Sequence, residues 1–73
     1  MTETQTVDAR GLSCPEPALM TRQALLKTGQ GEVVVLVDAI TSRDNVVRTA
    51  KLAGWQVAVQ PQDDGSYRLI LTK

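Results

Sequence analysis

The 73-residue chain contains no histidine and a single cysteine, Cys14. One cysteine excludes an internal disulfide, and without histidine the chain has too few ligands for a structural zinc site, which needs about four. A cysteine enzyme that works alone usually takes a histidine as its general base, and a dithiol redox cycle needs a second cysteine. The sequence therefore disfavours a metal centre, a self-sufficient cysteine enzyme and a dithiol redox protein, and we expect neither metal nor cofactor.

Phenylalanine is also absent, and with one tryptophan and one tyrosine the core must be largely aliphatic. Lysine and arginine number 8, as do aspartate and glutamate, and this formal balance gives no electrostatic reason to expect direct contact with nucleic acid or an anionic membrane. No apolar run approaches the ~20 residues of a membrane span, and no signal peptide is visible. Together with one free thiol, these absences predict a cytoplasmic protein.

Hydrophobic periodicity predicts one domain over residues 6–73, preceded by a flexible segment over 1–5. The expected order is strand, helix, strand, helix, strand, strand, over 6–9, 15–28, 32–38, about 41–53, 55–60 and 66–73. Right-handed crossovers place both helices on one face of the sheet, and the last strand forms a hairpin that inserts it between the second and third. The predicted fold is α+β: a two-layer α/β sandwich with a four-stranded mixed sheet.

Apolar residues at helical spacing should share one face of each helix. On the first these are Ala18, Leu19, Leu25 and Leu26, with Met20 and Ala24 extending the apolar surface sideways, and on the second they are Val46, Val47, Ala50 and Ala53. Thr41 or Ser42 is expected to cap the second helix, and Gly54 suits the position after its end. Trp55 is expected to pack in the core.

Cys14 stands in the stretch DARGLSCPEPALM, residues 8–20, before the first predicted helix. Pro15 suits the first helical position, which makes Cys14 the N-cap, where free N–H groups and the helix dipole favour a thiolate. Pro15 and Pro17 lack N–H groups and Glu16 brings a negative charge, so we expect only a modestly activated thiol. Pro15 also holds Cys14 extended and presents the sulfur on a stiff corner.

A presented sulfur that has neither a base nor a resolving thiol suits a group on which other proteins act. It can accept a group from one protein and surrender it to another. The group most natural to a cysteine in that role is a second sulfur, held as a persulfide.

At these residues the chain resembles the TusA/SirA family of small sulfur-carrier proteins. The family pattern is an aspartate, then a glycine, then Cys-Pro-x-Pro opening the first helix, and it corresponds here to Asp8, Gly11, Cys14, Pro15 and Pro17. The likeness spans about residues 6–73. The stretches DARGLSCPEP and NVVRTAKLAGW are also similar to the N-terminal domain of YedF-type proteins linked to selenium metabolism, which carry a second domain.

The resemblance implies that Cys14 holds sulfur as a persulfide, taken from a cysteine desulfurase or rhodanese-like protein and passed to a downstream acceptor protein. Such a sulfurtransferase-like carrier depends on its partners rather than acting as a stand-alone catalyst. Four pathways stay open: tRNA thiolation, molybdenum cofactor assembly, sulfur oxidation and selenium metabolism. The alternative function is a non-catalytic interaction or regulatory module in which Cys14 is not essential.

Two roles stay open for each residue just before Cys14. Asp8 either caps the turn at Gly11 through an Asx-type hydrogen bond or shapes the surroundings of the thiol. Arg10 is either a solvated surface residue or a cation that stabilises a thiolate or persulfide anion.

The residues just after the cysteine are equally open. Glu16 either complements the helix dipole or tunes the thiol or contacts a partner. Leu19 and Met20 either belong to the core or form an apolar rim for docking.

Overall fold

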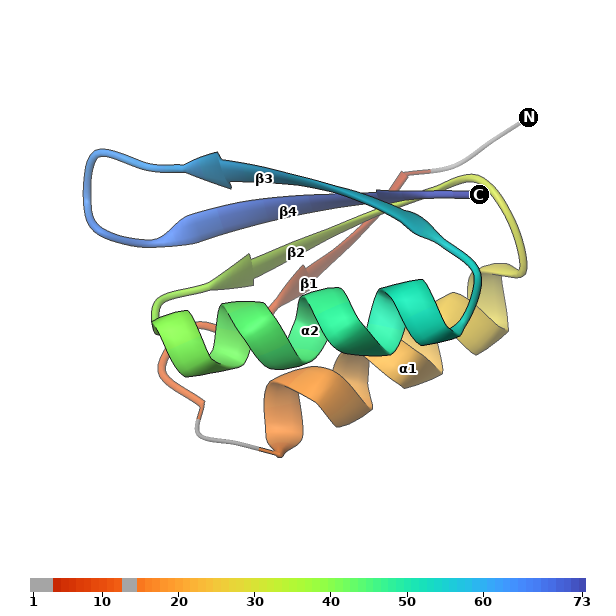
Figure 1. Ribbon diagram of the computed structural model, residues 1–73, viewed down its shortest axis with the longest axis horizontal. Helices are drawn as coiled ribbons and strands as arrows, with labels where there is room; N and C mark the ends of the chain where they lie inside the picture. Colours follow the sequence, from red (N-terminus) through yellow and green to blue (C-terminus); the bar gives the residue numbers. More distant parts are fainter. Residues whose placement is uncertain (1–3, 13–14) are drawn as a thin grey trace.

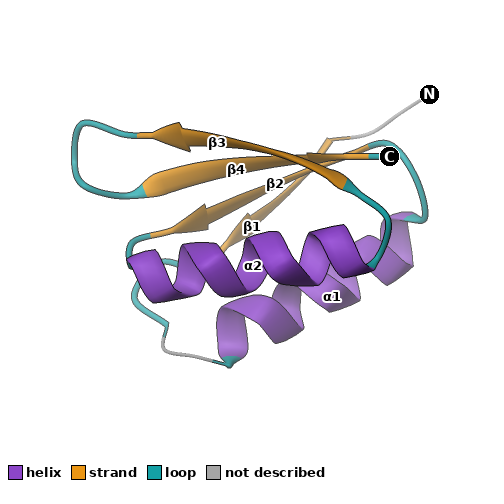
Figure 2. Ribbon diagram, in the orientation of Figure 1, coloured by secondary structure: helices purple, strands orange, loops and turns teal. Residues whose placement is uncertain are grey.

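The computed structural model describes residues 4–12 and 15–73 of the chain. Its elements follow the predicted order, and two helices cover one face of a sheet (Figures 1 and 2). The elements are β1 (Thr4–Asp8), α1 (Glu16–Thr28), β2 (Glu32–Val37), α2 (Ile40–Leu52), β3 (Gln56–Pro61) and β4 (Tyr67–Thr72). The predicted two-layer α/β sandwich is therefore confirmed. Neither described helix is both long and apolar enough to cross a membrane.

The sheet has the strand order β1-β2-β4-β3, which confirms the predicted insertion of the last strand. β1 and β2 are parallel, with Val7 opposite Val35, and β4 runs antiparallel to both of its neighbours. β1, β2 and β3 consequently point the same way, so their carboxyl ends share one edge. Both helices begin at this edge, on the left in Figure 1, and the loop between β3 and β4 lies there too.

The core is aliphatic apart from one indole. Alternate residues of the strands point towards the helices and pack against the buried faces of both. The buried cluster consists of Val7, Ala9, Ala24, Leu25, Val33, Val35, Val37, Val46, Ala50, Trp55, Leu69 and Leu71. The core position predicted for Trp55 is confirmed, with 4% of the residue exposed.

The buried face of α1 agrees with the prediction at Ala24 and Leu25 and differs from it at other positions. Leu19 and Leu26 are 52% and 74% exposed, while Pro17, Thr21, Ala24 and Leu25 are buried. Thr21 can enter the core because its hydroxyl donates a hydrogen bond to the carbonyl of Pro17, at 2.8 Å, which leaves no polar group unpaired. Because Thr21 is polar, a prediction based on hydrophobicity alone does not assign this side of α1 to the core.

The face of α2 is nearly as predicted. Val46 and Ala50 are fully buried and Val47 is half-buried against the core. Ala53 is exposed because it is the C-cap, one residue beyond the helix. Gly54 follows it at φ +88°, as its predicted place after the helix end requires.

The beginnings of two elements also differ from the sequence prediction. β1 begins at Thr4, two residues before the strand predicted over 6–9, because Thr4 and Gln5 pair with the first residues of β2. Residues 1–3 lie outside the described part. α2 begins at Ile40, because the N–H of Arg43 already reaches the carbonyl of Ala39. The predicted caps Thr41 and Ser42 lie inside the helix, and Ala39 caps it without a side-chain hydrogen bond.

Candidate functional site

The candidate site is the connection between β1 and α1, which carries the only cysteine. Ser13 and Cys14 lie outside the described residues, and with them the predicted exposure of Cys14. The residues on either side are described. They define the backbone path immediately before and after the cysteine.

The chain enters through a β-turn over residues 9–12. The N–H of Leu12 donates to the carbonyl of Ala9, at 3.4 Å. Gly11 is the third residue of this turn and has φ +78°, as a type II turn requires. A Cβ at Gly11 would meet nothing within 4 Å, so the glycine is required by the backbone angle rather than by space.

Asp8 and Arg10 are joined across this turn by a two-pronged ion pair. The Asp8 carboxylate accepts bonds from Nε and Nη2 of Arg10, both at 2.9 Å, and from the backbone N–H of Arg10, at 3.2 Å. The side-chain hydrogen bond from Arg10 is the main cause that lowers the pKa of Asp8 to about 2, and the same bond raises the pKa of Arg10. Asp8 does form an Asx-type hydrogen bond, but with the N–H of Arg10 rather than that of Gly11.

The N–H of Gly11 is bound by Asp38, a residue that the sequence analysis missed. Asp38 follows β2, and its Oδ2 accepts the bond at 3.0 Å. A signal was present, because the tripeptide Val-Asp-Ala occurs at both 7–9 and 37–39. Since β1 and β2 are parallel neighbours, this repeat brings both aspartates to the same edge of the sheet.

The chain leaves the cysteine at the start of α1, one residue later than predicted. Pro15 is the N-cap, with φ −99° and ψ 11°, and Glu16 is the first helical residue. The predictions that Pro15 occupies N1 and that the residue before it is the N-cap are therefore wrong. The reason is that the first helical bond runs from the N–H of Leu19 to the carbonyl of Pro15, at 3.1 Å. Pro15 is exposed whereas Pro17 is fully buried, so Pro17 anchors the beginning of the helix on the core.

The first turns of α1 separate an exposed side from a packed one. Glu16 and Leu19 are exposed, whereas Met20 is half-buried and packs against the core cluster. Leu19 is therefore not part of the core. Met20 is a core residue on its inner side, so Glu16 and Leu19 are the exposed residues of the first turn of α1, next to the cysteine connection.

The formally neutral chain is divided into an acidic and a basic end. The acidic end is the edge at which the cysteine connection lies, and it carries Asp8, Glu16, Asp38, Asp44, Asp63 and Asp64, with Arg10, Arg43 and Arg68 among them. The basic end extends from the middle of the helices to their carboxyl ends. It carries Arg22, Lys27, Arg48, Lys51 and Lys73, with Glu32 nearby at the start of β2. The balanced composition concealed this separation.

The cations of the acidic end are largely engaged. Arg10 pairs with Asp8, and Arg43 pairs with Asp44, at 3.1 Å, while its guanidinium lies 5.0 Å from the ring centre of Tyr67. In the described part of the chain, the carboxylate side chains form no group that could hold a metal ion. At this end, Asp8 and Asp38 therefore stabilise the backbone of the turn, and other carboxylates, such as those of Glu16 and Asp63, are exposed at the surface.

Comparison with known proteins assigns this arrangement to a family. Residues 5–73 match the family described as sulfurtransferase TusA. The fold is similar to the crystal structure of a SirA-like protein from Desulfitobacterium hafniense, with a TM-score of 0.88 and 33% sequence identity over 96% of each chain.

Proposed function

The chain belongs to the TusA family of sulfurtransferases, and from that membership we propose that it is a small sulfur carrier that holds sulfur as a persulfide on Cys14. The observation that carries the proposal is that the family match covers residues 5–73 of a chain with one cysteine. A family that transfers sulfur needs an atom to hold it. Cys14 is the residue of this chain that can bind sulfur covalently and release it again.

The proposed step is an exchange between persulfides. The Cys14 thiolate attacks the outer sulfur of a donor persulfide, the donor's S–S bond breaks, and a new S–S bond forms on Cys14. The electron pair leaves with the donor's thiolate, so the step needs no external oxidant or reductant. Attack by a thiol of the acceptor protein on the outer sulfur then repeats the exchange downstream.

The described contacts support a role in presentation rather than in acid–base chemistry. Before Cys14, the turn is held by the bond from Gly11 to Asp38 and by the pair of Asp8 with Arg10. After it, Pro17 is buried in the core. We assign Asp8, Gly11, Pro15 and Pro17 to positioning the cysteine. The Asp8 carboxylate is paired with Arg10, which lowers its pKa to about 2 and makes it a poor base, and the other three have no titratable side chain.

The absence of histidine from the sequence is the reason to expect that partners supply the reactivity. We propose a cysteine desulfurase or a rhodanese-like protein as donor, and a cytoplasmic setting in which the thiol stays reduced. Contact is expected at the acidic end, with Glu16 and Leu19 at the interface. A donor with a basic surface around its own cysteine would complement these carboxylates.

Mass spectrometry of the intact protein tests the proposal. After incubation with a cysteine desulfurase and cysteine, the chain should gain the mass of one or more sulfur atoms and lose it on reduction with a thiol. Cys14→Ser should gain nothing while unfolding at the same urea concentration. If the wild-type chain binds the desulfurase but never gains sulfur, the alternative of a regulatory or interaction module is correct.

A further inference from the structure

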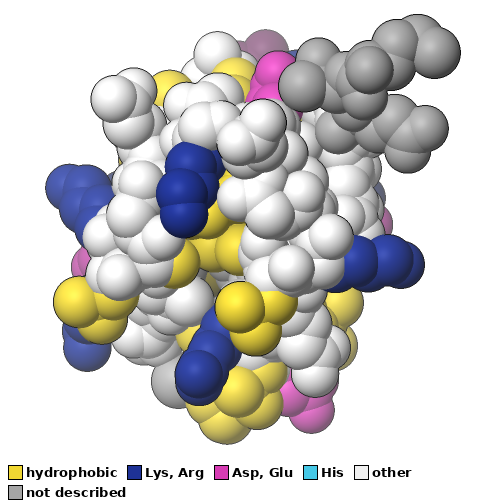
Figure 3. Space-filling view, turned by 90° about the vertical axis from the view of Figure 1, so that its right-hand side faces the viewer, with side chains coloured by type: hydrophobic (Ala, Val, Ile, Leu, Met, Phe, Trp, Pro, Cys, Tyr) yellow, Lys and Arg dark blue, Asp and Glu magenta, His cyan; other side chains and the backbone are white. Residues whose placement is uncertain are grey.

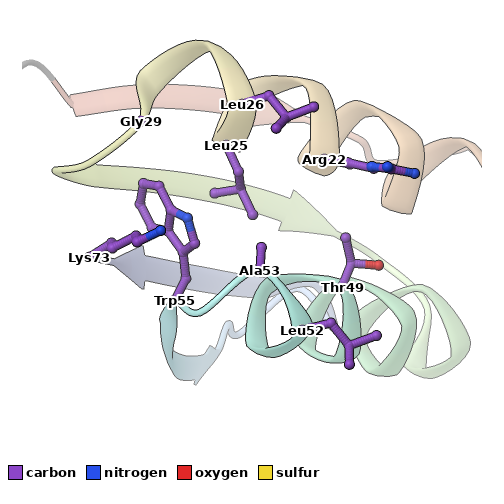
Figure 4. A pocket seen from close by; sticks show the side chains of 9 residues that line it. All are labelled: Arg22, Leu25, Leu26, Gly29, Thr49, Leu52, Ala53, Trp55 and Lys73. Atoms are coloured by element: carbon purple, nitrogen blue, oxygen red, sulfur yellow. The ribbon is translucent and has the colours of Figure 1, made fainter.

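A pocket of about 590 Å³ opens between the carboxyl-terminal halves of α1 and α2, at the basic end (Figure 4). It lies at the far end of both helices from the cysteine connection. Figure 3 shows this face, where apolar side chains line a hollow and lysine and arginine side chains stand beside it. Its volume falls within the roughly 300–1,000 Å³ of small-molecule sites.

The walls of the pocket are apolar and uncovered. Leu25 and Trp55 are buried beneath it, and Leu26 and Leu52 stand on either side, 74% and 82% exposed. Leu52 is the most exposed of the large apolar side chains in the described chain. A ligand with an apolar body would shield both leucines from water, and the burial of apolar surface would favour binding.

The charged side chains that line the pocket are both cations, Arg22 and Lys73. Neither forms an ion pair with a described residue. Lys27 and Lys51 lie in the last turns of their helices, where they complement the helix dipoles. That explanation does not extend to Arg22, in the middle of α1, or to Lys73, which follows β4.

Trp55 supplies a third donor. The residue is 4% exposed, and its indole N–H forms no hydrogen bond with a described residue. Because no buried side-chain nitrogen of the described residues is left without a partner, this N–H is open to the pocket. Figure 4 shows the indole nitrogen on the edge of the ring that faces the pocket, with the Lys73 side chain beside it. An anion bound in this pocket can accept a hydrogen bond from this N–H in place of water.

We propose that this pocket binds a small amphiphilic anion, an aliphatic carboxylate of medium chain length. The carboxylate accepts hydrogen bonds from Lys73 and the Trp55 indole, and the aliphatic chain lies between Leu26 and Leu52. Arg22, farther along the opening in Figure 4, adds a second positive charge. The site is separate from Cys14 and does not depend on the proposed sulfur transfer.

Trp55 is the only tryptophan of the chain, so its fluorescence reports on the pocket without a label. Titration with octanoate should change the emission saturably, and octylammonium, which has the same chain and the opposite charge, should not. Hexanoate should bind more weakly than octanoate, by up to about fourfold for each buried methylene removed. Lys73→Gln should weaken octanoate binding about tenfold, and Arg22→Gln about threefold.

Matched variants outside the pocket serve as controls. Arg68→Gln removes an exposed cation, and Leu19→Ser an exposed leucine, both away from this pocket; neither should alter octanoate binding, whereas Leu52→Ser should weaken it. The proposal is overturned if octylammonium binds as tightly as octanoate, if no saturable response occurs, or if the control variants weaken binding as much as the pocket variants. Binding of anionic phospholipid vesicles that Lys73→Gln and Arg22→Gln weaken, with no saturable response to octanoate, would also overturn it and assign the face to a membrane surface.

Discussion

Asp38 reaches across from the end of β2 and binds the backbone N–H of Gly11, at 3.0 Å, in the turn that leads to Cys14. The two residues are 27 positions apart in sequence. This bond joins the turn to the strand that neighbours β1, so the cysteine connection is fixed at its beginning by two strands rather than by one.

Asp38→Ala should loosen this turn with little effect on the fold. The bond is exposed, so its loss should reduce the free energy of unfolding by about 1 kcal/mol. Hydrogen exchange at the Gly11 amide should become faster, and sulfur loading by a desulfurase should become slower. Asp63→Ala removes another exposed carboxylate of the acidic end and is the matched control. If both variants load sulfur at the wild-type rate, Asp38 has no part in positioning the cysteine.

The ion pair of Asp8 with Arg10 predicts a specific pH dependence. Because the hydrogen bond from Arg10 lowers the folded-state pKa of Asp8 from 3.8 to about 2, the pair stabilises the folded chain above pH 3.8. Its contribution disappears as the pH falls from 3.8 towards 2. The effect should be small, since both side chains are exposed.

NMR titration of the Asp8 carboxyl carbon measures this directly. The wild-type midpoint should lie near pH 2, and Arg10→Gln should raise it towards 3.8. Arg43→Gln, which removes the cation of the other exposed ion pair, should leave the Asp8 midpoint unchanged. An unchanged midpoint in Arg10→Gln would show that the pair does not persist in solution.

The sequence predicted the architecture because its strands and helices each carry a strong local pattern. The β-branched run of β2 and the alternation in β4 leave little freedom in the sheet, and the short hairpin forces β4 beside β3. The face of α1 was predicted only in part because Thr21 is buried through a bond to a backbone carbonyl. Hydrophobicity scales do not account for such a hydrogen bond between a side chain and the backbone.

The candidate site was predictable only where its interactions are local. The turn at Gly11 follows from the residue type, and Asp8 with Arg10 is a contact two positions apart. The bond of Asp38 depends on strand pairing, so it required the register of β1 against β2. The charge division between the two ends likewise depends on topology, which places carboxylates far apart in sequence at one edge.

Pro15 and Pro17 should behave differently when each is replaced by alanine. Pro15 is exposed, so Pro15→Ala should change the free energy of unfolding by no more than about 1 kcal/mol while slowing sulfur loading, because Cys14 regains the α region. Pro17 is fully buried, so Pro17→Ala should destabilise the fold by about 1–2 kcal/mol through lost packing. Urea unfolding and loading rates separate the two effects, and equal stability of the two variants would contradict the anchoring role of Pro17.

Gly11→Ala tests the backbone angle of the turn. Gly11 and Gly65 both have positive φ, +78° and +88°, and a Cβ at either would meet nothing within 4 Å. Both alanine variants should therefore lose a similar amount of stability, about 1–2 kcal/mol. Only Gly11→Ala should slow sulfur loading, because Gly65 lies in the loop between β3 and β4. Equal loading by both variants would remove the turn from the mechanism.

The exposed side of α1 should determine how the donor docks. Leu19 is 52% exposed, so Leu19→Ser should leave stability within about 0.5 kcal/mol of wild type, and Glu16→Gln should do the same. Both should slow loading by a desulfurase more than they slow alkylation of Cys14 by iodoacetamide, because a small reagent needs no docking surface.

The acidic end adds a dependence on salt to the same experiment. If a basic donor surface meets these carboxylates, loading should slow as ionic strength rises, and Glu16→Gln should reduce that dependence. Leu26→Ser, at the basic end, is the control that should load normally. If Glu16→Gln and Leu19→Ser slow alkylation and loading equally, these residues tune the thiol itself; if only Leu26→Ser slows loading, the donor docks on the opposite end of the helices and the interface proposed for the acidic end is wrong.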